Sequence, residues 1–281
     1  GTTRYPDMES LSARLDELYG TAIEPVVRRI GEIQCLGFYA SIPEPEYLPG
    51  HEDVLGAAAE LLGELLLFPA TRGGLLLPQY VDSEREKAED MIKGRVNDKR
   101  SYSLTRCIEE MCCYEDFAVG RLGSLDDMRS VNYKKLTKQY RALLQTAPIE
   151  IFYCGKAPKK RLVSALRDAL STLPRGEIDY DIGTDVRMNS VEEQPRYVEE
   201  ELEVTQGKLV IGWRLGECMD EPDYPALYVF NAVFGSGAAS KLFVNVRERL
   251  SLCYYASSLL DLHKGLMLVA SGIEFDNFDA A

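Results

Sequence analysis

The sequence predicts an α+β fold in which antiparallel β-sheets carry helices packed on one side. The composition is that of a folded protein, with 46% apolar and 27% charged residues, 22 Gly and 13 Pro in 281 residues. Stretches with the two-residue period of β-strands alternate with stretches that have helical spacing. A strand, an acidic corner with Pro and Tyr, and an apolar helix occur in this order twice, with the corners at 43–49 and 220–225. This self-similarity indicates a duplicated unit.

The N-terminal half is expected to be mostly helical. Leu11, Leu15 and Leu18 share one helical face, and Gly20 follows them as a helix terminator. A turn at 30–31 separates two strand-like stretches. The predicted elements are a helix over 7–20, strands over 21–28 and 32–42, helices over 53–68 and 79–113 with a break near 97–98, and a helix that begins at Ser124 or Asn132 and ends near Leu144.

The C-terminal half is expected to hold a second domain of similar build. Ala147 and Pro148 introduce a strand over 149–154, so we place the domain boundary between residues 146 and 147. Domain 1–146 is expected to be truncated at its start, and domain 147–281 at its end. The other predicted elements are a helix with Leu162, Leu166 and Leu170, an irregular acidic stretch over 175–201, a strand over 208–215, an apolar helix over 226–234, a Gly-rich loop over 235–238, a helix over 241–249, and strands over 254–260 and 266–275.

Charge and hydropathy exclude two classes of partner. The chain has 32 Lys and Arg against 45 Asp and Glu, a net charge of −13, and lacks a basic patch, so no nucleic acid is expected to bind. The apolar stretches are shorter than the roughly 20 residues that cross a bilayer, so no membrane is expected either. Seven cysteines without a C-x-x-C pair favour a reducing compartment, and we expect a cytoplasmic location.

The residues by themselves do not predict a metal or nucleophile site. The chain has two histidines, His51 and His263, and neither belongs to an H-E-x-x-H or H-x-x-E-H sequence. Both are expected to lie at the surface. A cysteine nucleophile usually needs a histidine near it, and no such pairing is visible in the sequence.

The stretch FGSGAASKLFVNVRERLSLCYYASS, residues 234–258, carries the strongest signal. It closely resembles the second-domain signature of the pitrilysin and insulin-degrading-enzyme metallopeptidases, the inverzincins. Three further segments resemble the same family in the expected order: the segment after its zinc helix at 1–6, its mid-domain turn at 123–131, and the strand that opens its second domain at 147–155. The resemblance covers nearly the whole chain, and it implies two similar pitrilysin-like domains.

The resemblance also implies where zinc would be held in active relatives. Their H-x-x-E-H motif would precede Gly1, and their third ligand, a glutamate, maps to Met91, with the accessory acidic residue at Glu84. A thioether is a poor substitute for a carboxylate on zinc. Another register makes Glu84 the ligand, but it leaves Leu77 at the accessory position. We prefer Met91, and therefore expect no bound cofactor and no metal site in this chain.

The resemblance assigns substrate contacts to Arg247 and Tyr254. In active members the matching Arg holds the substrate backbone and the matching Tyr steadies the developing oxyanion. The alternative is structural: Arg247 pairs with Glu248 or another carboxylate at a helix end, and Tyr254 is half-buried in the sheet.

These observations predict a non-catalytic or degenerate member of the metallopeptidase family. It would help to form a peptide-binding chamber for bacterial peptide processing, as a homo-oligomer or hetero-oligomer with a catalytic homologue. Two alternatives stay open: an active zinc endopeptidase whose H-x-x-E-H lies before residue 1, and a purely structural subunit. Whether the chain is an enzyme is therefore undecided from the sequence, and a peptide is the expected substrate or ligand.

Overall fold

The computed structural model describes residues 1–182, 194–216 and 222–280, and these form two compact units. Unit 1 comprises Gly1–Arg28, Gln34–Glu89 and Leu125–Gly183, and unit 2 comprises Arg29–Ile33, Asp90–Ser124 and Thr184–Ala281. Each unit combines segments from both sides of the predicted boundary at residue 147. That boundary, as a division of the sequence into two domains, stays a prediction.

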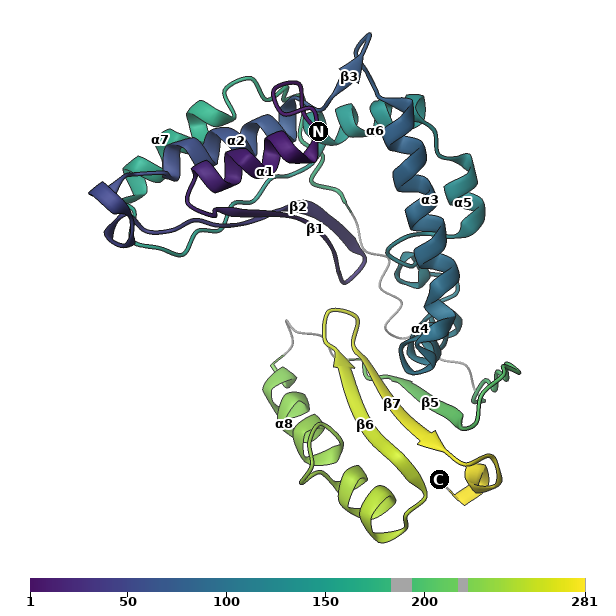
Figure 1. Cartoon of the computed structure of the whole chain (residues 1–281). Helices are drawn as coiled ribbons and strands as arrows, with labels where there is room; N and C mark the ends of the chain where they lie inside the picture. The colour runs from purple at the N-terminus through teal and green to yellow at the C-terminus, as the bar shows by residue number, and fades with distance from the viewer. Residues whose placement is uncertain (183–193, 217–221, 281) are drawn as a thin grey trace. The chain divides into compact units, whose positions relative to one another are not determined.

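Unit 1 is a helical layer against a β-hairpin (Figure 1). Its elements are α1 (Met8–Glu17), most of β1 (Ala22–Ile30), β2 (Ile33–Ser41), the 3-10 turns η1 (Pro45–Tyr47) and η2 (Pro49–His51), α2 (Leu55–Leu67), a short hairpin of β3 (Thr71–Arg72) and β4 (Leu75–Leu76), most of α3 (Pro78–Gly94), α5 (Leu125–Ser130), α6 (Tyr133–Thr146) and α7 (Lys159–Ala169).

The core of unit 1 lies between α1, α2 and the hairpin. Leu18, Leu48, Val54 and Leu61 are buried and touch one another. The side chain of Asp7 caps the N-terminus of α1. It accepts a 2.8 Å hydrogen bond from the backbone N–H of Ser10, the third residue of the helix. The leucines whose spacing predicted this helix therefore lie on the face of α1 that packs into the core.

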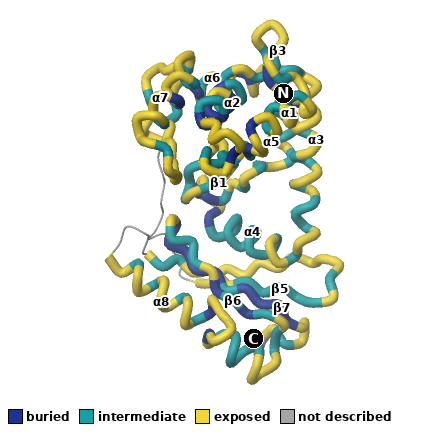
Figure 2. The backbone as a smooth tube through the Cα atoms, turned by 60° about the vertical axis from the view of Figure 1, so that its left-hand side comes forward, coloured by how far each residue is buried: buried dark blue, intermediate teal, exposed yellow. Residues whose placement is uncertain are grey.

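Unit 2 is built on a three-stranded antiparallel sheet with the order β5-β7-β6. The central strand β7 is almost wholly buried (Figure 2). The elements of unit 2 are η3 (Arg95–Asn97), α4 (Lys99–Met111), η4 (Asp116–Ala118), β5 (Gly207–Arg214), α8 (Tyr224–Phe234), the π-helix η5 (Phe243–Arg249), β6 (Cys253–Asp261), β7 (Leu266–Ile273) and η6 (Phe275–Ala280).

The two faces of this sheet are covered by different helices. A Cβ at Gly212 of β5 would lie only 2.0 Å from Sδ of Met111, so the Met111 side chain of α4 packs closely against that face. The Ser258 hydroxyl of β6 donates a 2.6 Å hydrogen bond to Asn231 of α8. Gly212 and Ser258 pair with consecutive residues of β7, which point to opposite faces. Helix α8, from the C-terminal half, thus covers one face of the sheet, and α4 covers the other.

A buried ion cluster ties three parts of unit 2 together. Lys264, in the turn between β6 and β7, is ion-paired with Glu32 and with Glu115, 2.5 Å from the latter. Arg214 at the end of β5 also pairs with Glu115. The side chains of Lys264, Glu32 and Glu115 are 0%, 1% and 3% exposed. The cluster therefore joins the β1–β2 turn, the segment after α4, and the sheet.

The electrostatics of the cluster favour the charged forms of Glu115 and Lys264. Burial alone would raise the pKa of Glu115, but hydrogen bonds from Lys264 and Arg214 outweigh burial and lower it. Burial alone would lower the pKa of Lys264, but hydrogen bonds to Glu115 and Glu32 raise it. The ring of Phe117 lies 5.6 Å from the Lys264 ammonium and helps to shut out water. Each charge is thus held by its partners.

Most predicted elements are confirmed, including the α+β class and the break between α3 and α4. The helix expected to begin at either Ser124 or Asn132 is in fact two helices, α5 and α6. The helix predicted over 241–249 is wound largely as a π-helix. Part of the second acidic corner, at 217–221, lies outside the described residues. No described helix has both the length and the apolar content needed to cross a bilayer.

The strand predicted over 149–154 is wrong. These residues have no strand assignment, and Phe152 is 90% exposed. The alternation of apolar residues there is typical of a strand, but a strand also needs a partner for its backbone groups, and none of the described strands pairs with this segment. Alternating apolar residues show that a segment could form a strand, but they do not show whether another strand is placed to pair with it.

Replacing Lys264 with Met should strongly destabilise the protein. The variant keeps a similar side-chain volume but leaves the carboxylates of Glu32 and Glu115 buried with less compensating charge, which typically costs about 3–5 kcal/mol. Urea unfolding measures the loss. Lys241→Met, at an exposed position, is the matched control and should change the free energy of unfolding little. Equal effects of the two substitutions would show that the cluster does not hold unit 2 together.

Candidate functional site

Arg247 and Tyr254 lie side by side in unit 2. Arg247 is near the end of η5 and Tyr254 near the start of β6. The Arg247 guanidinium lies 5.9 Å from the centre of the Tyr254 ring and 4.5 Å from that of Phe243. The Arg247 side chain is 38% exposed and Tyr254 is 75% exposed. The two side chains that the resemblance singled out therefore form one solvent-facing patch, the Arg–Tyr patch.

A β-bulge sets the position of Tyr254. On β7, Ile273 pairs with Cys253 and Gly272 pairs with Tyr255, so Tyr254 is an extra residue without a partner opposite it. A bulge of this kind re-aims a side chain out of the regular alternation of the strand. Ser251, just before the strand, has a φ of 51°, which turns the chain sharply between η5 and β6. The local backbone therefore presents Tyr254 to solvent.

The structural alternative for Arg247 has weak support in this geometry. In the described part of the chain Arg247 pairs with Glu248, whose carboxylate is 3.6 Å from Nε and is itself 56% exposed. An exposed pair at this distance contributes little to stability. Stacking on Phe243 is what fixes the guanidinium. The substrate-contact roles of Arg247 and Tyr254 remain predictions.

The residues mapped to the zinc position lie on α3. Met91 is 52% exposed, and Glu84, seven residues earlier on this helix, forms a 2.6 Å ion pair with Lys87. Glu89, two residues before Met91 on the helix, faces Arg85 at 3.8 Å. Among the residues that the structure describes, no group of three or more His, Cys, Asp or Glu side chains is arranged to hold a metal ion. The donors present do not fit a zinc centre.

The two histidines are both exposed, as the sequence predicts. The ring Nδ1 of His51 lies 3.2 Å from the carbonyl oxygen of Pro45, within the corner that precedes α2. Neither histidine belongs to a metal-binding cluster in the described part of the chain. They therefore add no chemistry to the candidate site.

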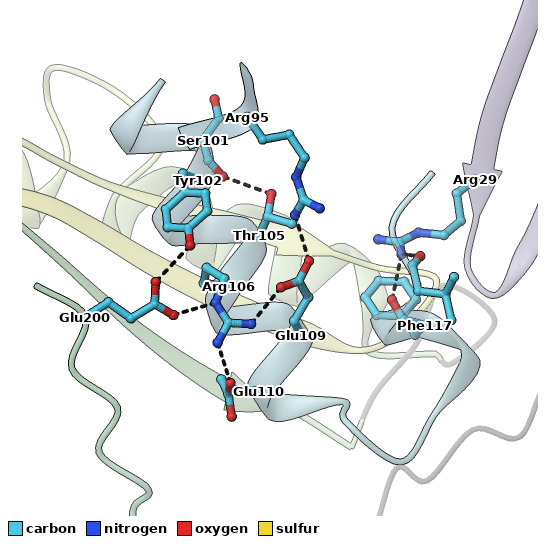
Figure 3. Close-up of polar contacts among 11 residues, drawn as sticks. Arg29, Arg95, Ser101, Tyr102, Thr105, Arg106, Glu109, Glu110, Phe117 and Glu200 are labelled. Carbon is cyan, nitrogen blue, oxygen red and sulfur yellow. Dashed lines mark hydrogen bonds and ion pairs between the residues drawn. The ribbon is translucent and has the colours of Figure 1, made fainter. Parts of the chain in front are cut away.

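Sequence reasoning missed a cleft of about 420 Å³ in unit 2. Its polar centre is Arg106 of α4, which is hydrogen-bonded to three carboxylates at once (Figure 3). The cleft is lined by Ile92, Val96, Arg95, Tyr102, Arg106, Glu109 and Glu200. The helical spacing of Arg106, Glu109 and Glu110 is visible in the sequence, but Glu200 is 94 positions from Arg106 and no local pattern links them.

Comparison with solved structures defines the class of fold. The chain matches a conserved protein from Enterococcus faecalis V583 with a TM-score of 0.83 and 28% identity, covering 100% of this chain and 65% of that one. It matches the peptidase M16 inactive domain from Pseudomonas fluorescens with a TM-score of 0.70 and 14% identity, covering 98% of this chain and 62% of that one. The second likeness bears on the fold alone. The fold is that of M16 peptidase domains.

The sequence comparisons give the family. Residues 130–281 match the family model described as the Peptidase M16 inactive domain. The probable inactive metalloprotease YmfF of Bacillus subtilis (strain 168) is 36% identical over 283 residues. The alignment covers 100% of this chain and 65% of the relative, so the chain spans just under two thirds of that protein. The chain belongs to the M16 peptidase family, which confirms the resemblance to pitrilysin-type metallopeptidases.

The purified chain should bind no stoichiometric zinc. Met91 offers a neutral thioether where a carboxylate is needed, Glu84 is engaged by Lys87, and Glu89 is directed to Arg85. The measurement is elemental analysis after equilibration with excess zinc and gel filtration, with a chelator-treated sample as the control. One zinc per chain that survives gel filtration would contradict this expectation.

Proposed function

We propose that this chain is a non-catalytic M16-family protein that grips peptides through the Arg–Tyr patch. The observation that carries the proposal is the placement of Arg247 and Tyr254 together and exposed, while the described residues offer no fitting zinc centre. The guanidinium can donate to a peptide carbonyl or carboxylate, and the Tyr254 hydroxyl can donate or accept a second hydrogen bond. Such a site holds a peptide without cleaving it.

The sheet of unit 2 supplies a way to hold the peptide backbone. Among the strands that the structure describes, β5 and β6 form the two edges of this sheet, and Tyr254 lies at the start of β6. An extended peptide can add to a sheet edge through main-chain hydrogen bonds, which give affinity with little sequence preference. Side chains beside that edge then select among peptides. This combination supports binding of many peptides rather than recognition of one sequence.

The proposal includes a catalytic homologue as the partner. A chain that grips peptide but lacks a zinc centre would contribute to proteolysis by forming part of a chamber wall in a homo-oligomer or hetero-oligomer. The six cysteines in the described part of the chain are free thiols, which fits a reducing compartment such as the bacterial cytoplasm. Peptide processing is the activity that the assembly would serve.

Substituting Arg247 with Ala should weaken peptide binding and leave the fold intact. Loss of a charge-assisted hydrogen bond is expected to cost about 1–3 kcal/mol of binding free energy. Because the pair with Glu248 is exposed, stability should change by less than about 1 kcal/mol. Peptide titrations and thermal melts on the same variant measure both quantities.

Arg249→Ala is the matched control for Arg247→Ala. Arg249 is in the same π-helix and hydrogen-bonds to Asn245 over 3.2 Å, so this control removes the same charge nearby. It should bind peptide almost as well as the unmodified chain. If Arg247→Ala melts far lower but binds peptide normally once folded, Arg247 is structural and the proposed grip is wrong.

The chain should bind basic or neutral peptides more tightly than acidic ones. Its net charge of −13 repels anions and attracts cations over a distance that salt shortens. Titration with two peptides of equal length, one rich in Lys and one rich in Glu, at low and high salt, measures the preference. Equal affinities that do not respond to salt would contradict the electrostatic part of the proposal.

A further inference from the structure

The Arg106 side chain is held in place by its own helix. Its Nη1 donates to Glu109 over 2.7 Å and its Nη2 donates to Glu110 over 2.6 Å, three and four residues further along α4. Glu109 is held in turn by Arg95, also at 2.7 Å. These contacts fix the plane of the guanidinium, and they leave its Nε directed at Glu200 (Figure 3).

The remaining edge of Arg106 is occupied by a carboxylate from elsewhere in the chain. Nε of Arg106 donates to one oxygen of Glu200 over 2.6 Å, and the Tyr102 hydroxyl donates to its other oxygen over 2.9 Å. The hydrogen bond from Arg106 is the main cause that lowers the pKa of Glu200. Arg106 and Tyr102, one helical turn apart, therefore form a two-point clamp on a carboxylate.

Glu200 belongs to residues 194–203, a segment that we call the acidic strap. The strap has no regular secondary structure, and all of its residues are exposed. Its other described anchor is Arg196, which donates to the backbone carbonyl of Glu110 over 2.9 Å. Because the strap is tethered by side chains at the surface, Glu200 can leave the clamp without unfolding a helix or a strand.

We propose that the Arg106–Tyr102 clamp is a carboxylate-binding site for peptides and that Glu200 is its built-in competitor. An incoming carboxylate would take the two hydrogen bonds that Glu200 now accepts, and the strap would swing away while Arg196 still tethers it. The adjoining cleft of about 420 Å³ has room for the residues attached to that carboxylate, with Ile92 and Val96 as apolar walls. The site does not use Arg247 or Tyr254, so it goes beyond the proposed peptide grip.

The charge of the clamp favours a single carboxylate over a more highly charged anion. With Glu200 displaced, Glu109 and Glu110 still face Arg106, and they would repel a second negative charge on the ligand. The planar two-oxygen geometry already fits Glu200. The ligand could present either its C-terminal carboxylate or an acidic side chain, since both groups have the same chemistry.

The test compares three synthetic peptides of equal length on the Glu200→Ala variant of the whole chain. The first has a free C-terminus and no acidic side chain, the second is amidated and contains one Glu, and the third is amidated and has no carboxylate. Removing the competitor should tighten binding of the first peptide, the second, or both by about fivefold relative to the unmodified chain. The third peptide should bind both proteins equally. The first two arms identify which carboxylate the clamp prefers.

Glu199→Ala is the matched control, since it removes the same charge from the neighbouring exposed position of the strap. It should leave all three affinities unchanged. In the Glu200→Ala background, Tyr102→Phe removes one hydroxyl from the clamp and should reverse part of the gain, and Arg106→Gln should abolish it. Thermal melts confirm that each variant is folded. If Arg106→Gln does not fold, Tyr102→Phe still tests the clamp.

Three outcomes would overturn the proposal. One is an equal gain for the amidated peptide that has no carboxylate, and another is an equal gain with Glu199→Ala; either would trace the effect to general charge. The third is no gain for either carboxylate peptide with Glu200→Ala. None of these results depends on whether Arg247→Ala binds peptide, so the clamp and the proposed grip stand or fall separately.

Discussion

The buried ion cluster around Lys264 is the constraint on which the rest of unit 2 depends. Its ammonium is fully removed from water and is held by Glu32 and Glu115, which come from distant parts of the sequence. Charges this deep are tolerated only when their partners are in place, because each would otherwise lose its hydration without compensation. The cluster therefore specifies one arrangement of the β1–β2 turn, the end of α4 and the sheet.

The position of α4 follows from this constraint and determines what the helix can offer. Arg214 of β5 contacts Glu115 and also donates to the backbone carbonyl of Met111, the last residue of α4, over 2.8 Å. Close approach at Gly212 then leaves one side of the helix against the sheet. The side that carries Arg106 and Glu109 is left to line the cleft. A packing requirement on one side of the helix thus orients a polar cluster on the other.

Local patterns predicted the parts of this protein that depend on local physics. Leucine spacing predicted α1 and α7. Arg247 and Tyr254 were singled out by the resemblance of residues 234–258 to a family and not by local physics, and their roles stay predictions. Three features were beyond this reasoning. The segment at 149–154 has strand periodicity but no described partner strand, the bulge at Tyr254 depends on the register with β7, and the contact of Glu200 with Arg106 joins residues 94 positions apart. Each is set by which segments meet in space.

The two sites proposed for unit 2 differ in how their charge is balanced. Because of this difference, the ligand that each site takes does not follow from the net charge of the chain alone. Arg247 is stacked on aromatic rings, and the carboxylate of Glu248 that lies 3.6 Å from it is exposed, so its positive charge remains open to a peptide. Arg106 is surrounded by carboxylates, and a ligand gains access to it only by replacing Glu200. The long-range field of an acidic protein disfavours anions at both sites. At Arg106, however, exchange of one carboxylate for another leaves the local charge unchanged, so short-range hydrogen-bond geometry decides which carboxylate stays.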